Sequence, residues 1–289
     1  MKFGTSLMGI RTRDYAEVAS CFERAGFESV WVPEHLAFPT EMPPTYPYSE
    51  SGLPMVDVKT PCYDPWVLLS YLACATSTIR LGTNVGILPL RHPLQTARAV
   101  VTVDRLAGGR VTIGAGVGWL EDEFTWTGQD FHDRGRRTDD IIRIFRRLWS
   151  DDVIEEHSEF YDFGPLHFEP KPLQKSGIPI EIGGSSRPAL RRAGKIGDGW
   201  LEVGARDFDE FTANLAIVLD ARRDAERGDI PFEITVGSAL APDLESMQRA
   251  RDLGATRIMA SPWQGGAAVS PAEAREWADR YADEIMGNV

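Results

Sequence analysis

Short runs of β-branched and apolar residues alternate with longer segments of helical period along the chain. Each run and the segment after it occupy roughly 30 to 40 residues, which is the spacing of repeated β–α units. The runs that we expect to be strands are Lys2–Leu7, Ser29–Val32, Ile79–Thr83, Val111–Ala115, Ile178–Ile182, Trp200–Val203, Glu233–Ser238 and Arg257–Ala260. Eight such units predict a (β/α)8 TIM barrel, a cylinder of parallel strands surrounded by helices.

The segments between these runs have the pattern of helices that cover a sheet. Apolar residues recur at intervals of three and four, as in Tyr15, Val18 and Phe22, and this spacing predicts one buried helix face. Asp64 stands before Pro65, which is typical of a helix start because the carboxylate caps free N–H groups and proline suits the first turn. Function is then expected just after each strand, since barrel active sites lie at the carboxyl ends of the strands.

Length and charge narrow the class of protein. A chain of 289 residues can form one barrel, so we expect a single domain over residues 1–289. The formal net charge of -12 repels phosphate backbones and anionic membrane surfaces, so neither a nucleic-acid nor a membrane partner is expected. No apolar stretch of membrane-spanning length and no signal peptide are recognisable, which favours a cytoplasmic location. The three cysteines are expected to be small core residues, and no metal-ligand spacing is found.

Two long segments interrupt the alternation. One is the insertion after the second strand, Leu36–Tyr63, which is rich in Pro, Tyr and Ser and has no helical period. It lies on the expected catalytic side, so we interpret it as a wall or lid for a small-molecule substrate. The other is the insertion before the fifth strand, Asp151–Ser176, whose alternating pattern predicts a β-hairpin with its turn at Asp162–Pro165.

A glycine-serine turn follows the fifth expected strand. Gly183, Gly184, Ser185 and Ser186 lie between that strand and a helix expected over Pro188–Lys195. Glycine allows close approach of backbone N–H groups to an anion, and the start of a helix adds free donors and a positive dipole end, so this turn suits a phosphate. The same residues would also serve as an ordinary capped strand-to-helix turn.

A carboxylate and an imidazole follow the second expected strand. Glu34 and His35 come directly after Trp31–Val32, where barrel side chains point toward the active site. His35 is the preferred acid, base or anion-stabilising residue, because its charge state is easily tuned near neutral pH. The alternative is a histidine that only supports the following loop.

Glycine recurs at every second position in two further runs, Leu81–Gly86 and Ile113–Trp119. Missing side chains on one face leave room for a flat ligand against the backbone. Close packing at a barrel corner would use glycine in the same way, and the residues alone do not decide between these interpretations.

Three segments together resemble the luciferase-like superfamily, and within it the branch that uses the deazaflavin coenzyme F420. The segments are AEVASCFERAGFESVWVPEH, STIRLGTNVGILPLRHPLQTARAVVTVDRLAGGRVTIGAGVGW and IPIEIGGSSRPALRRAGKIGDGW. The resemblance extends from Met1 to about Trp200 and is looser beyond. It implies an oxidoreductase with F420, or alternatively FMN, as cofactor.

The resemblance also implies roles for particular residues. The cofactor phosphate would be held by the backbone of residues 183–186, and the non-proline peptide Asn84–Val85 would be cis, forming a bulge against the ring. His35 would manage the proton or the developing charge, and Glu34 would orient His35. The ring contacts that it implies are Thr83, Asn84, Val85, Gly116 and Val117.

Departures from the family pattern bear on the substrate. Trp119 stands where the sugar-phosphate dehydrogenase subgroup has a glutamate, and Phe38 and Pro39 replace an expected tryptophan. These residues favour a fairly apolar small molecule, for which Phe38 and Trp119 would form walls.

We therefore expect hydride transfer between F420 and such a substrate. The alternatives are an FMN-dependent monooxygenase of the same fold, served by a partner flavin reductase, and a non-catalytic flavin-binding protein. Members of the family often form dimers, so the resemblance is also compatible with a homodimer.

Overall fold

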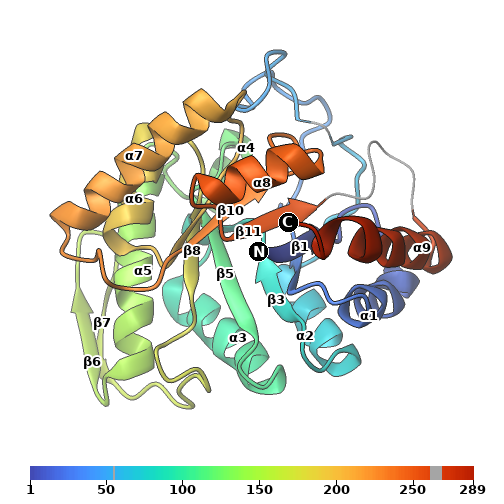
Figure 1. Cartoon of the computed structure of the whole chain (residues 1–289). Helices are drawn as coiled ribbons and strands as arrows, with labels where there is room; N and C mark the ends of the chain where they lie inside the picture. The colour runs from blue at the N-terminus through green and yellow to red at the C-terminus, as the bar shows by residue number, and fades with distance from the viewer. Residues whose placement is uncertain (55, 261–268) are drawn as a thin grey trace.

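The chain forms a closed barrel of parallel strands with helices outside it (Figure 1). A computed structural model describes residues 1–54, 56–260 and 269–289. The barrel strands are β1 (Lys2–Ser6), β2 (Ser29–Val32), β3 (Arg80–Thr83), β5 (Val111–Gly116), β8 (Ile180–Gly183), β9 (Gly199–Leu201), β10 (Glu233–Gly237) and β11 (Arg257–Ala260). They pair in the order β3-β2-β1-β11-β10-β9-β8-β5, and pairing of β3 with β5 closes the ring.

The predicted (β/α)8 TIM barrel is therefore confirmed. Two of the expected strands, β2 and β11, have the predicted bounds, and the other ends shift by one or two residues. The prediction omitted β4 (Gly86–Ile87), which pairs with β5 and opposes Gly86 to Ala115. Two residues are too few to give a recognisable pattern in the sequence.

Helices cover the outside of the barrel (Figure 1). They are α1 (Tyr15–Arg24), α2 (Pro65–Ala75), α3 (Pro93–Leu106), α4 (Glu121–Thr127), α5 (Arg134–Ser150), α6 (Arg187–Ile196), α7 (Phe208–Asp224), α8 (Leu244–Asp252) and α9 (Pro271–Tyr281), with short turns η1 (Thr12–Asp14), η2 (Leu88–Leu90) and η3 (Ala282–Met286). The predicted cap is confirmed: the Asp64 carboxylate accepts from the backbone N–H groups of Trp66 and Val67, at 3.0 and 3.1 Å.

The expected hairpin is present, but the prediction of its turn was wrong. It consists of β6 (Ile154–His157) and β7 (Asp162–Leu166), which pair antiparallel. The turn is Ser158–Tyr161, closed by a bond from Ser158 N–H to the Tyr161 carbonyl at 2.9 Å. Asp162–Pro165 belongs to the second strand, where Gly164 and Pro165 imitate a turn in the sequence.

The barrel interior is a packed core. Trp31, Leu201 and Met259 form one cluster inside it, and Trp31 fills the space beside Gly82, where an added Cβ would lie 2.4 Å from the indole. Nearer the amino ends of the strands, the fully buried guanidinium of Arg257 contacts the Glu181 carboxylate at 2.9 Å. Cross-barrel packing thus leaves the carboxyl ends of the strands as the accessible end.

The cysteines only partly match the expectation of small core residues. Cys21 is buried, Cys62 is half-buried and Cys74 is exposed, and all three are free thiols. The apolar character of α2 is not confined to its buried face, so the pattern around Cys74 misled the prediction. None of the described helices is both long enough and apolar enough to span a membrane.

Candidate functional site

The predicted site residues meet at the carboxyl-end rim of the barrel. His35 follows β2, Asn84 and Val85 follow β3, Trp119 follows β5, and the glycine-serine turn follows β8. Parallel strands bring all of these segments to one end of the barrel. The Asn84 N–H donates to the Val32 carbonyl at 2.8 Å, which joins the segment after β3 to the end of β2.

The peptide bond between Asn84 and Val85 is cis, as the resemblance implies. Asn84 is exposed at the rim, whereas Val85 is half-buried. An added Cβ at Gly116 would lie 2.4 Å from Val85 Cγ2, and one at Gly183 would lie 2.7 Å from Cγ1. Side chains at these two positions would occupy the space of Val85, so glycine there lets the valine fit against the strands.

This packing corrects one interpretation of the glycine repeat. The space beside Gly114 is filled by the Thr83 carbonyl at 1.9 Å, and that beside Gly118 by Ile87 and Phe124. Thr83 also bonds through its hydroxyl to the Gly114 carbonyl at 2.8 Å. These glycines, together with Gly116, allow close packing of protein groups rather than leaving an open face for a ligand. Direct ring contacts of Thr83, Gly116 and Val117 remain predictions.

His35 is held by a buried carboxylate. Its Nδ1 lies 3.0 Å from Glu123 Oε2, and the Glu123 side chain is 0% exposed against 16% for the histidine. Glu123 comes from the first turn of α4, and its other oxygen accepts from the Leu36 N–H at 2.6 Å. A carboxylate accepts hydrogen bonds, so Nδ1 carries a proton toward Glu123 and Nε2 is left for other chemistry.

Glu34 has a different role from the predicted orientation of His35. Its carboxylate accepts from the Ile87 N–H at 2.6 Å and from Arg91 Nε at 2.8 Å. Arg91 also donates to Asp64 at 2.9 Å. Burial raises the pKa of the Glu34 carboxyl, and the positive charge of Arg91 opposes that rise. Glu34 therefore fixes the base of the loop, and Glu123 orients the histidine.

Aromatic side chains cover the rim beside His35. Its ring centroid lies 4.7 Å from that of Phe38 and 5.9 Å from that of Trp119. Tyr46 continues the series at 5.2 Å from Trp119, and Tyr48 at 5.5 Å from Tyr46. The loop after β2 therefore forms an apolar wall beside the histidine.

The turn after β8 offers fewer amide donors than expected. Gly184 has φ +119°, a conformation that favours glycine. Its N–H donates to the Leu201 carbonyl at 3.3 Å, so this amide is already used within the barrel. Ser186 caps α6 by accepting from the Ala189 N–H at 3.4 Å. The donors that face an anion are thus the backbone N–H groups that begin at Ser185, not those of the glycines.

Sequence reasoning did not single out Glu123, Tyr48 or Arg91. Glu123 lies in the acidic run Glu121–Glu123 at a helix start, where carboxylates are expected for the helix dipole alone. Arg91 precedes a predicted cap, which gave it no separate signal. The contacts that reveal these residues join positions 57 and 88 residues apart in the chain.

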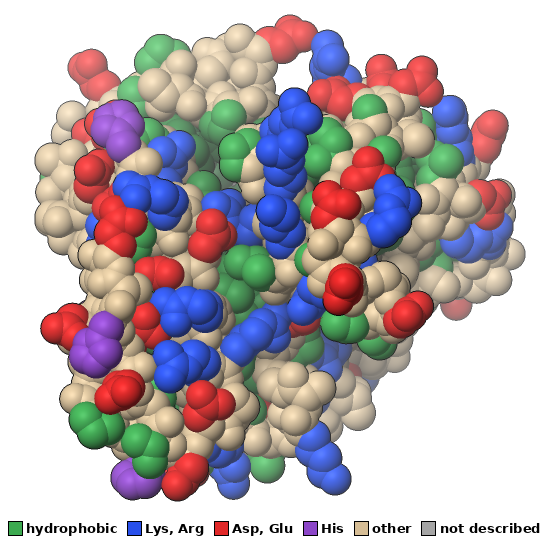
Figure 2. All heavy atoms as spheres, turned by 90° about the vertical axis from the view of Figure 1, so that its left-hand side faces the viewer, with side chains coloured by type: hydrophobic (Ala, Val, Ile, Leu, Met, Phe, Trp, Pro, Cys, Tyr) green, Lys and Arg blue, Asp and Glu red, His purple; other side chains and the backbone are tan. Residues whose placement is uncertain are grey.

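Charged groups elsewhere have structural partners. Figure 2 shows Lys and Arg side chains gathered with acidic ones on the face that carries α5, α6 and the hairpin. Arg143 binds Glu156 of β6 at 2.7 Å, and Arg146 binds Asp198 at 3.0 Å. Among the residues that the structure describes, no group of three His, Cys, Asp or Glu side chains could hold a metal ion.

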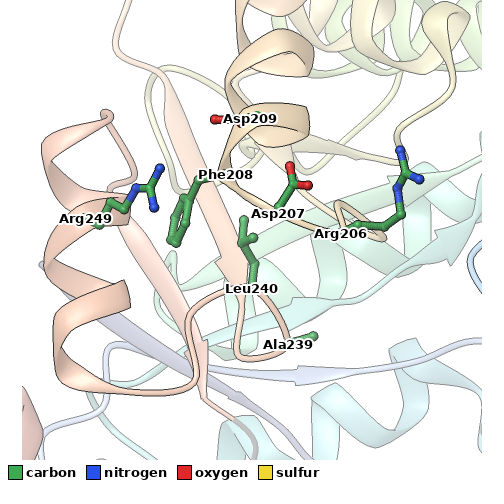
Figure 3. Close-up of a pocket in the computed structure, with 7 residues that line it drawn as sticks. All are labelled: Arg206, Asp207, Phe208, Asp209, Ala239, Leu240 and Arg249. Atoms are coloured by element: carbon green, nitrogen blue, oxygen red, sulfur yellow. The ribbon is translucent and has the colours of Figure 1, made fainter.

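A separate pocket opens between the segments after β9 and β10 (Figure 3). It has a volume of about 320 Å³. Phe208 and Leu240 lie at its centre, and Arg249 places its guanidinium 4.6 Å from the Phe208 ring centroid. Arg206 pairs with Glu210 at 2.9 Å. The pocket lacks a histidine and is lined by none of the predicted site residues.

Comparisons with known proteins match nearly the whole chain. The family model described as luciferase-like monooxygenase matches residues 2–286. An uncharacterised protein of Mycobacterium tuberculosis is 32% identical over 279 residues, 95% of each chain. The FMNH(2)-dependent dimethylsulfone monooxygenase of Pseudomonas putida is 29% identical over 74% of this chain and 61% of its own.

A solved structure shares the fold. The coenzyme F420-dependent tetrahydromethanopterin reductase of Methanopyrus kandleri superposes with a TM-score of 0.76 over 99% of this chain and 98% of the other. The two sequences are 16% identical, so this likeness bears on architecture alone.

Proposed function

The chain belongs to the luciferase-like monooxygenase family, and on that premise we propose that it transfers hydride between coenzyme F420 and a small, fairly apolar organic substrate. The observation that carries this proposal is His35, held through Nδ1 by the buried carboxylate of Glu123 beside an aromatic wall. Hydride transfer to or from carbon leaves a proton to be supplied or removed. A positioned imidazole suits that task.

The residues at the rim fit a flat, phosphate-bearing cofactor. The bulge at Asn84–Val85 presents backbone to the rim, and Val85 is fixed beneath it between Gly116 and Gly183. Backbone N–H groups at Ser185 and at the start of α6 suit a phosphate, because they are donors at the positive end of a helix dipole. When bound, F420 would supply the hydride-carrying carbon, and the protein would orient it.

His35 would hold or accept the proton at Nε2. Glu123 favours the tautomer with hydrogen on Nδ1 and stabilises positive charge on the ring when Nε2 gains a proton. The half-buried position of His35 against Phe38 and Trp119 limits its contact with water. The same two aromatic side chains would face an apolar substrate.

FMN-dependent monooxygenation is the second candidate. It is favoured by the 29% identity to a P. putida enzyme whose name specifies FMNH2. Such an enzyme would need reduced flavin from a partner reductase. The phosphate turn does not distinguish the two cofactors, since both carry a phosphate.

Separate titration of the purified protein with F420 and with FMN tests the proposal. We expect saturable binding of F420, followed by absorbance changes at the deazaflavin band when a panel of alcohols, aldehydes and ketones is added. Tight binding of FMN without binding of F420 would contradict the proposal and favour the monooxygenase. Binding without turnover by any substrate, unchanged in His35→Ala, would favour a non-catalytic flavin-binding protein.

A further inference from the structure

Tyr48 reaches across the barrel mouth to the turn after β8. It belongs to the loop after β2, and in the ring of strands β9 lies opposite β2. An added Cβ at Gly184 would lie 3.0 Å from the Tyr48 hydroxyl oxygen, and one at Gly204 would lie 2.9 Å from its Cδ1. The tyrosine therefore lies directly over the two segments that follow β8 and β9.

The hydroxyl of Tyr48 occupies the position of an anion on this turn. The backbone N–H of Ser185 is hydrogen-bonded to it, and this bond lowers the pKa of Tyr48, while burial and the nearby Glu202 raise it more. The phenol is consequently neutral near pH 7. A neutral oxygen thus accepts from the first amide that the turn offers to a phosphate.

A phosphate oxygen and this hydroxyl cannot both accept from the Ser185 N–H in the same position. An acceptor must lie about 2.7–3.2 Å from the amide nitrogen, in nearly the direction of the N–H bond. That position is filled by the tyrosine oxygen. We propose that Tyr48 closes the anion site of the ligand-free protein and that a phosphate-bearing ligand must displace its hydroxyl from the turn.

The exchange favours the ligand because hydrogen bonds to an ionised acceptor are roughly twice as strong as neutral ones. The dipole of α6 adds to this preference for negative charge. A phenol can therefore close the turn without preventing phosphate binding.

Displacement of Tyr48 would also reach the rim beside His35. Tyr48 packs edge-on against Tyr46, and Tyr46 packs edge-on against Trp119, with centroids 5.5 and 5.2 Å apart. Trp119 in turn contacts the imidazole of His35. Occupation of the phosphate turn is thus linked through stacked rings to the wall beside the histidine. This inference rests on the proposed function for the identity of the ligand, but not for the closure itself.

Tyr48→Phe tests the closure, because it keeps the ring contacts and removes only the hydroxyl. Tyr46→Phe is the matched control, since it removes a hydroxyl from the same aromatic series away from the turn. Affinities for inorganic phosphate, FMN and riboflavin are measured by calorimetry for both variants and for the wild type. Riboflavin carries the ring without a phosphate.

We expect Tyr48→Phe to bind inorganic phosphate and FMN about two- to tenfold more tightly than the wild type, the effect of removing one competing hydrogen bond. Riboflavin affinity should be unchanged, and Tyr46→Phe should behave as the wild type. Equal or weaker phosphate binding by Tyr48→Phe would overturn the inference, as would no phosphate binding by any of the three proteins. Failure of both FMN and F420 to bind, with the phosphate result as expected, would overturn the proposed function alone.

Discussion

At the scale of single residues, the rim of the barrel is arranged around Val85. Its side chain fits between Gly116 and Gly183, and its peptide bond with Asn84 faces the rim. The sequence could indicate that glycine was needed near these positions, but not which atoms would fill the space. That depends on contacts between β3, β5 and β8, which no local pattern encodes.

Gly116→Ala should disturb this arrangement. The added methyl would lie 2.4 Å from Val85 Cγ2, so the valine must move. We expect a loss of about 1–3 kcal/mol in the free energy of unfolding, the usual cost of overpacking, and weaker cofactor binding. Gly237→Ala is the control, because its added Cβ meets nothing within 4 Å. Urea unfolding should also show that Val85→Ala partly restores stability to Gly116→Ala; no restoration would contradict the packing account.

Glu123→Gln should change the tautomer of His35. A glutamine oxygen that keeps the Leu36 N–H bond would turn its NH2 group toward Nδ1, which must then accept. We expect 15N NMR of labelled protein to report hydrogen on Nδ1 in the wild type and on Nε2 in the variant. Glu121→Gln, an exposed change on the same helix turn, should leave the ring unchanged. Identical tautomers in the wild type and Glu123→Gln would refute the role of Glu123.

At the scale of elements, one arginine holds both ends of the loop that covers the mouth. Arg91 binds Glu34 just after β2 and Asp64 just before α2. The lack of helical period predicted the loop, and its proline and tyrosine content predicted a wall. The clamp at its base could not be predicted, because its three charges are far apart in sequence and each has an ordinary local explanation.

Arg91→Met should destabilise the protein strongly. It leaves the Glu34 carboxylate, whose side chain is 2% exposed, without its cation. Breaking a buried pair from one side costs about 3–5 kcal/mol. Adding Glu34→Gln should recover part of that loss in urea unfolding, since the uncompensated charge is then absent. Additive losses in the double variant would argue against coupling.

The hairpin should contribute a pH-dependent share of stability. Hydrogen bonds from Arg143 hold the pKa of Glu156 below its ordinary value of 4.5. This contribution is fully present above that value and is lost as the pH falls through the lowered folded-state pKa. Glu156→Gln should therefore be less stable than the wild type at pH 7, by roughly 1–2 kcal/mol because the arginine is partly exposed.

Urea unfolding between pH 7 and pH 3.5 or so covers this window. The gap between Glu156→Gln and the wild type should narrow as the pH falls below 4.5. Glu155→Gln, on the exposed face of the same strand, serves as the control and should match the wild type. A gap that stays constant down to the lowest pH would contradict the assignment.

At the scale of the whole molecule, the sequence was sufficient to predict the barrel. Strands buried on both faces appear as apolar runs, and the helices between them carry one apolar stripe, so the repeat of eight units is visible. The carboxyl-end location of the site follows from that topology. Partners within the site are harder to predict, because Glu123 and Tyr48 act through contacts that only the closed ring creates.

The central claim is that a flat cofactor rests on the Asn84–Val85 bulge with its phosphate at the amides of Ser185 and Ser186. The most direct test is a crystal structure of the protein soaked with F420. We predict the ring against the bulge beside His35, and phosphate oxygens about 2.7–3.2 Å from the Ser185 nitrogen, with the Tyr48 hydroxyl moved away. A cofactor bound elsewhere, for instance with its phosphate between Arg206 and Arg249 in the pocket of Figure 3, would contradict the account.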